Sequence, residues 1–157
     1  MNQELLALFE QDQADRDGGL RPDARARDDR RRHQVEALIA AGGLRDPEDY
    51  YHAAMVFQHG TKPAHYLRAH ELASRGAELG VREARWLAAA AYDRWLMMNG
   101  RPQKYGTQYR ADGGRWMLWE VDPATTDAER AEWDVPTLAE AHARAEEMTR
   151  ADPPPRR

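Results

Sequence analysis

The most constraining feature of this 157-residue chain is a nearly apolar stretch, residues 85–99, that contains the adjacent charges Asp93 and Arg94. Its spacing predicts a helix with apolar side chains in almost every direction. At least one of the two charges must therefore point inward, and a buried charge needs a partner or a ligand. The next run, Gly-Arg-Pro-Gln-Lys-Tyr-Gly-Thr-Gln at positions 100–108, is rich in uncharged polar groups that can supply hydrogen bonds.

The composition favours a helical protein, because Ala, Arg and Glu are common while Val and Ile are scarce. We expect one helical domain over residues 1–150 and a disordered, proline-rich tail over residues 151–157. The absence of cysteine excludes disulfides and thiolate chemistry. No apolar run is long enough for a membrane helix and no signal pattern is present, so we expect a cytoplasmic protein without membrane association. A net charge of −4 argues against nucleic-acid binding.

Start and stop signals divide the chain into elements. They predict helices over residues 3–17, 23–41, 47–58, 63–79 and 85–99, and two short helices opened by the capping boxes at Thr126 and Thr137. Residues 105–110 and 115–121 flank a turn at 111–114, which predicts a β-hairpin. The fold class is therefore mainly α, an antiparallel helical array with one C-terminal hairpin. Small residues at Ala69, Ala73 and Gly76 resemble the paired helices of tetratricopeptide or Sel1 repeats, although neither visible pair matches a full consensus.

The apolar stripe of the first predicted helix becomes polar toward its C-terminal end. Leu5 and Phe9 are followed on the same stripe by Asp12, Gln13 and Arg16. Asp12 and Arg16 could form an ordinary exposed ion pair, but their place on the apolar stripe favours a cleft. The arginine-rich residues 25–32 are interleaved with aspartates, which indicates a solvated helix face.

Gln58 and His59 end the third predicted helix. A histidine there commonly caps the last carbonyl groups, yet His59 is also the best candidate for acid/base chemistry near neutral pH. None of the histidines is paired with Glu in a helical zinc motif, so we expect a protein without a metal or a cofactor. The six are His33, His52, His59, His65, His70 and His142.

The segment before the predicted hairpin is a candidate recognition element. In an extended conformation Gln103, Tyr105 and Thr107 would share one side and Gln108 would lie on the other. Carboxamides donate and accept hydrogen bonds at once, which suits an amide or sugar-like ligand. The alternative is a polar edge strand with a bulge at Gly106.

These motifs together resemble an uncharacterised bacterial family. Its pattern is Asp-Gln-x-x-Arg, then Gln-His, then Asp-Arg, then Gly-x-Pro-Gln-x-Tyr-Gly-Thr-Gln. Here it corresponds to Asp12-Gln13 with Arg16, Gln58-His59, Asp93-Arg94 and residues 100–108, over roughly residues 5–134. The family carries no assigned activity, so the resemblance implies only that these positions belong to one pattern.

We expect these polar residues to converge around one cleft. The leading hypothesis is a metal-free enzyme acting on a small amide- or peptide-like molecule, with His59 as acid/base and Asp93 or Asp12 orienting it. The expected substrate-binding residues are Asp12, Arg16, Gln58, Arg94, Gln103, Tyr105 and Gln108. The alternatives are a helical scaffold or peptide-binding module with a structural polar network, in which Asp93 and Arg94 form a salt-bridge hub, and a small-ligand sensor.

Overall fold

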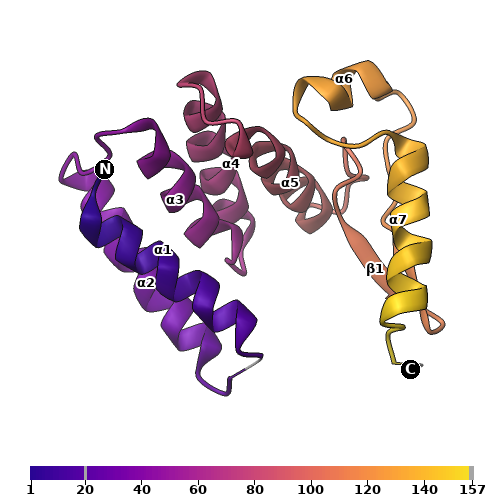
Figure 1. The fold of residues 1–157 in the computed structure, drawn as a ribbon, viewed down its shortest axis with the longest axis horizontal. Coiled ribbons are helices and arrows are strands. Elements are labelled where there is room, and N and C mark those ends of the chain that lie inside the picture. Colours follow the sequence, from indigo (N-terminus) through magenta and orange to yellow (C-terminus); the bar gives the residue numbers. More distant parts are fainter. Residues whose placement is uncertain (20, 156–157) are drawn as a thin grey trace. The chain divides into compact units, whose positions relative to one another are not determined.

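The computed structural model describes residues 1–19 and 21–155, and over these residues the chain forms seven helices and one hairpin (Figure 1). This architecture confirms the predicted fold class. In chain order the elements are α1 (Gln3–Asp17), α2 (Ala24–Ala40), α3 (Pro47–Gln58), α4 (Pro63–Glu78), α5 (Glu83–Met98), β1 (Tyr109–Asp112), β2 (Arg115–Leu118), α6 (Asp127–Glu132) and α7 (Leu138–Ala151). Each helix lies within about two residues of its predicted bounds. No helix in the described chain has the length and apolar character needed to cross a membrane.

The chain divides into two compact units, Met1–Ala88 and Ala89–Arg157, with the boundary inside α5. We describe each unit by itself. The single domain predicted over residues 1–150 stays a prediction.

In the first unit, α3 packs against α1, α2 and α4, and α1 lies beside α2 (Figure 1). Asn2 begins α1 by accepting the backbone N–H groups of Glu4 and Leu5. The buried carboxylate of Asp49 accepts the N–H of Asn2 at 2.8 Å and that of Asp46 at 3.0 Å. The starts of α1 and α3 are thereby joined by one side chain.

Small residues bring the helices of this unit close together. Gly76 in α4 faces α3, and a Cβ atom there would lie 3.5 Å from the Cβ of Tyr50 and 3.3 Å from that of Ala84. The remaining core of the unit is mainly aliphatic, and includes Leu5, Val35, Ala53, Val56, Ala69 and Leu72. Burial of this apolar surface is the main stabilising term.

The second unit contains the hairpin. Gly113 and Gly114 both have positive φ, 57° and 78°, which places them alone in a two-residue turn between β1 and β2. Ala111 and Asp112, predicted to be in the turn, pair instead with Trp116 and Arg115. β2 also packs against α7 (Figure 1).

The end of the chain is tied to this hairpin. Both predicted capping boxes are present, at Thr126 and Thr137, and open α6 and α7. The indole Nε1 of Trp116 donates to the carbonyl of Asp152 at 2.8 Å, just after α7. Residues 156 and 157 of the predicted disordered tail lie outside the described residues.

Candidate functional site

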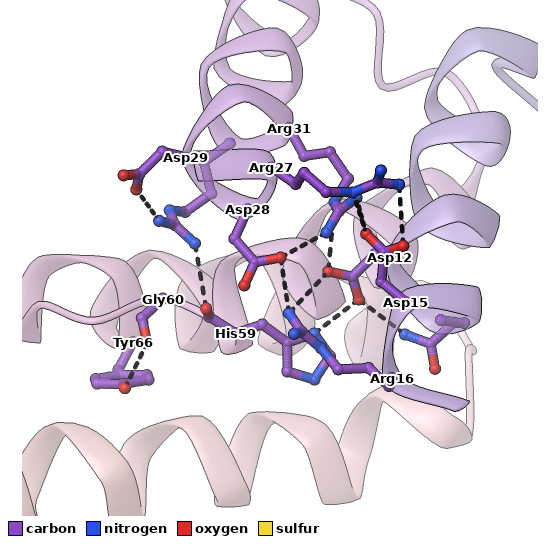
Figure 2. A network of polar contacts seen from close by, with 12 residues as sticks. Asp12, Asp15, Arg16, Arg27, Asp28, Asp29, Arg31, His59, Gly60 and Tyr66 are labelled. Carbon is purple, nitrogen blue, oxygen red and sulfur yellow. Dashed lines mark hydrogen bonds and ion pairs between the residues drawn. The ribbon is translucent and has the colours of Figure 1, made fainter. Parts of the chain in front are cut away.

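The first unit brings His59 and Asp12 into contact, from the end of α3 and the C-terminal half of α1. Nδ1 of His59 lies 2.7 Å from Oδ2 of Asp12 (Figure 2). Asp12 is only 1% exposed, whereas the His59 side chain is 22% exposed. With the proton on Nδ1, the ring donates to the carboxylate and its Nε2 is left as an acceptor. We call these two residues the His59–Asp12 pair.

Asp12 also belongs to an ionic cluster between α1 and α2, which we call the Asp12 cluster (Figure 2). Its members are Asp12, Asp15, Arg16, Arg27, Asp28 and Arg31. Arg16 reaches Asp12 at 3.3 Å and Asp28 at 2.9 Å. Arg31 reaches Asp15 at 2.7 Å and Asp28 at 2.5 Å. Three carboxylates thus face three guanidinium groups, so the cluster is balanced in charge without His59.

The loop that carries His59 is fixed by two further side chains. Arg32 donates to the carbonyl of His59 at 3.2 Å, and the hydroxyl of Tyr66 donates to that of Gly60 at 2.7 Å. Gly60 has no room for a side chain, because a Cβ atom would lie 2.3 Å from the Cβ of His65. His59 is therefore held at its backbone carbonyl by Arg32 and at its ring by Asp12.

The interpretation of residues 25–32 as a solvated face is wrong for three of them. Asp28, Arg31 and Arg32 are 9%, 3% and 5% exposed. The sequence did contain a signal of their burial. Arg31 and Arg32 lie one turn before Val35 and Asp28 lies two turns before it, on the helical stripe that continues to Leu38. Asp28 pairs with Arg31 at i,i+3 and both are buried, whereas Arg32 reaches Asp29, whose side chain is 59% exposed.

In the second unit, Asp93 is 0% exposed and accepts five hydrogen bonds from the segment after α5. Its Oδ1 accepts the N–H groups of Lys104 and Tyr105 at 2.7 and 2.9 Å. Its Oδ2 accepts the N–H groups of Gly106 and Thr107 and the Thr107 hydroxyl. The expectation that at least one charge of the pair points inward, with partners from beyond the helix, is confirmed.

Residues 104–107 consequently curl around the carboxylate and are not extended as predicted. Four successive N–H groups converge on one anion, which an extended strand cannot achieve because its N–H groups alternate in direction. Gly106 makes the turn possible with a φ of 95°.

Two glutamines complete this arrangement. The Gln103 side chain is fully buried, donates to the carbonyls of Gln108 and Trp119, and accepts the N–H of Gln108. Arg94 donates through Nε to the Gln108 side chain at 2.9 Å. Gln103 thus holds two chain segments together, while Arg94 and Gln108 form a half-buried pair beside them.

Burial changes the titration of two groups here. It raises the pKa of Asp93, although the hydrogen bonds from Tyr105, Thr107 and Lys104 act in the opposite direction. Burial, with the nearby charge of Asp93, also raises the pKa of the Tyr105 hydroxyl to about 12. Tyr105 therefore stays protonated at neutral pH and can act only as a hydroxyl donor or acceptor.

The predicted site residues fall into two sets. Asp12, Arg16 and His59 meet in the first unit, where Gln58 is buried next to His59. The second unit brings together Asp93, Arg94, Gln103, Tyr105 and Gln108. Their convergence in one cleft stays a prediction. Among residues 1–19 and 21–155, no group of three His, Asp or Glu side chains is arranged to hold a metal ion.

Comparison with known proteins gives no name to either set. No family model, curated protein or solved structure matches this chain. Function must therefore be argued from the geometry.

Proposed function

We propose that the His59–Asp12 pair is the acid/base centre of a metal-free enzyme that acts on a small amide- or peptide-like molecule. The observation that carries the proposal is the 2.7 Å contact between a partly exposed imidazole and an almost fully buried carboxylate. Such a carboxylate fixes the tautomer and orientation of the ring and stabilises the imidazolium formed when the ring takes a proton.

The partly exposed side chains of His59 and Arg16 can contact a substrate, and their proposed roles follow from this exposure. Nε2 of His59 takes a proton from a water molecule as the water oxygen adds to the amide carbon. It then gives that proton to the leaving nitrogen as the C–N bond breaks, so the ring ends each cycle unchanged. Arg16, whose side chain is 32% exposed, is the proposed contact for an anionic end of the substrate. Gln13 donates to Oδ2 of Asp12 at 3.0 Å and steadies the carboxylate that orients the ring.

The test is to incubate the protein with a panel of dipeptides and N-acyl amino acids and to measure turnover as the amine that is released. His59→Gln should lower kcat by about 100-fold or more, the usual contribution of a positioned acid/base group. Asp12→Asn should also lower kcat, because a neutral amide no longer stabilises the imidazolium. The matched control is His142→Gln, which replaces an exposed histidine of the other unit. Full turnover by the His59→Gln variant would remove this residue from the proposed mechanism.

A second candidate is a scaffold or peptide-binding module in which the polar residues are structural. It is favoured by Asp93, whose carboxylate is occupied by five donors of its own chain. On this proposal His59→Gln changes stability and no substrate of the panel is turned over. The two candidates therefore differ in whether any turnover depends on His59.

A further inference from the structure

A second polar feature of the first unit is lined by none of the predicted site residues, although one of its members, Arg32, donates to the carbonyl of His59. It is a pocket of about 320 Å³ between α2, the loop after α3 and the start of α4. Its volume is within the range of small-molecule sites. The polar lining side chains are Asp29, Arg32, His33, Glu36, Thr61, Lys62 and His65, and Phe57 supplies an apolar wall.

The two carboxylates of this pocket are already paired. Asp29 accepts from the guanidinium of Arg32, and Glu36 accepts from that of Arg68 at 3.3 Å. Within the described chain, neither the Lys62 ammonium nor the His33 ring forms a hydrogen bond or an ion pair. The pocket therefore offers two hydrogen-bond donors without a partner in the described chain, while each of its carboxylates already accepts from an arginine.

His65 adds a directed donor. Its Nδ1 accepts the backbone N–H of Thr61 at 3.1 Å, so the proton of the neutral ring resides on Nε2. Burial and the positive charges of Arg32 and Lys62 lower the pKa of His65, with a smaller contribution from His33, while Asp29 acts oppositely. Burial and the neighbouring cations thus disfavour a positive charge on this imidazole.

We propose that this pocket binds the phosphate group of a small organic phosphate. A phosphate dianion can accept from His33 of α2 and, at the start of α4, from Lys62 and Nε2 of His65. The volume exceeds that of a phosphate alone, and the ring of Phe57 offers apolar contact to the organic part. This inference goes beyond the proposed acid/base function, because binding here needs no chemistry at His59.

The first test is calorimetric titration with inorganic phosphate and with phenyl phosphate at fixed ionic strength. Phenyl phosphate should bind more tightly than inorganic phosphate, and Lys62→Gln should weaken its binding about tenfold. Lys104→Gln is the matched control, because Lys62 and Lys104 are the only lysines of the chain and the substitution removes the same charge. His33→Asn, at another exposed position, should weaken binding in the same direction.

The second test follows the imidazole signals of His65 by NMR. Saturating phenyl phosphate should raise its pKa, because a bound dianion favours the charged ring. An equal loss of affinity in Lys62→Gln and Lys104→Gln, or an unchanged His65 pKa, would overturn the site. Equal affinity for the two phosphates would overturn the assignment to an organic ligand. His59→Gln should bind phenyl phosphate like the unmodified protein, so failure of the acid/base proposal leaves this result intact.

Discussion

The Thr107 hydroxyl lies 2.7 Å from Oδ2 of Asp93 and donates the only side-chain hydrogen bond among the five that this carboxylate accepts. The other four come from the backbone of residues 104–107. The segment after α5 is thus organised around an anion that the helix itself provides. The Asp93 carboxylate accepts hydrogen bonds from converging backbone N–H groups, as a bound anion does in anion-binding loops.

Replacement of Asp93 should therefore destabilise the protein strongly. In Asp93→Asn an amide NH₂ faces backbone donors, leaving at least two buried N–H groups without an acceptor, and we expect a loss of roughly 3 kcal/mol or more. Thr107→Val, which removes one donor, should cost about 1 kcal/mol. Urea unfolding measures both, and Asp112→Asn on the exposed hairpin is the control. An Asp93→Asn variant as stable as this control would contradict the structural role.

The Asp12 cluster makes a second prediction about stability. Arg31 is 3% exposed and contacts the carboxylates of Asp15 and Asp28. Arg31→Met keeps most of the side-chain volume but leaves buried negative charge uncompensated, so we expect a loss of roughly 3 kcal/mol. Arg25→Met, at an exposed position of the same helix, should change the free energy of unfolding by less than about 0.5 kcal/mol. Similar losses in the two variants would show that the cluster contributes little.

Burial of His52 predicts that the free energy of unfolding depends on pH. Its ring stacks on Phe9 with centroids 4.5 Å apart, and burial lowers its pKa below the ordinary 6.5, while Asp49, Glu48 and Glu10 act oppositely. The unfolded chain therefore takes up a proton near pH 6.5 that the folded chain takes up only at lower pH. The stability that His52 contributes is complete above about pH 6.5 and is lost as the pH falls through the lowered value.

This contribution is measured as the difference in urea stability between pH 7.5 and pH 5.5. His52→Phe preserves an aromatic ring against Phe9 and should make this difference smaller. His142→Gln, which replaces an exposed histidine, should leave it unchanged. An equal pH difference in the unmodified protein and His52→Phe would refute the assignment.

The helices were predictable because their signals are local. They act within a few residues of one another, and include the Asp46-Pro47 start, the glycines at helix ends and the two threonine capping boxes. That at least one of Asp93 and Arg94 points inward was predictable for the same reason, since the composition of one helix sufficed. The conformation of its partners was not, because alternation along residues 103–108 cannot reveal that an anion gathers their N–H groups.

The ionic cluster shows a different limit. The composition of residues 25–32 is typical of a solvent-exposed helix face. Only their alignment with Val35 on a helical stripe distinguishes Asp28, Arg31 and Arg32 from surface residues. The contact between His59 and Asp12 spans 47 positions in the chain. Local patterns named both residues as site candidates, but their pairing depends on how α1 and α3 pack.

Asp12 has two roles at once, since the carboxylate that orients the His59 ring also accepts a hydrogen bond from Arg16 and faces Arg31. Any substitution of Asp12 that changes the orientation of the imidazole must therefore also alter how firmly the first two helices are joined. Ring orientation and helix packing are coupled at a single side chain. Variation at this position is therefore constrained by the proposed chemistry of His59 and by the packing of α1 against α2.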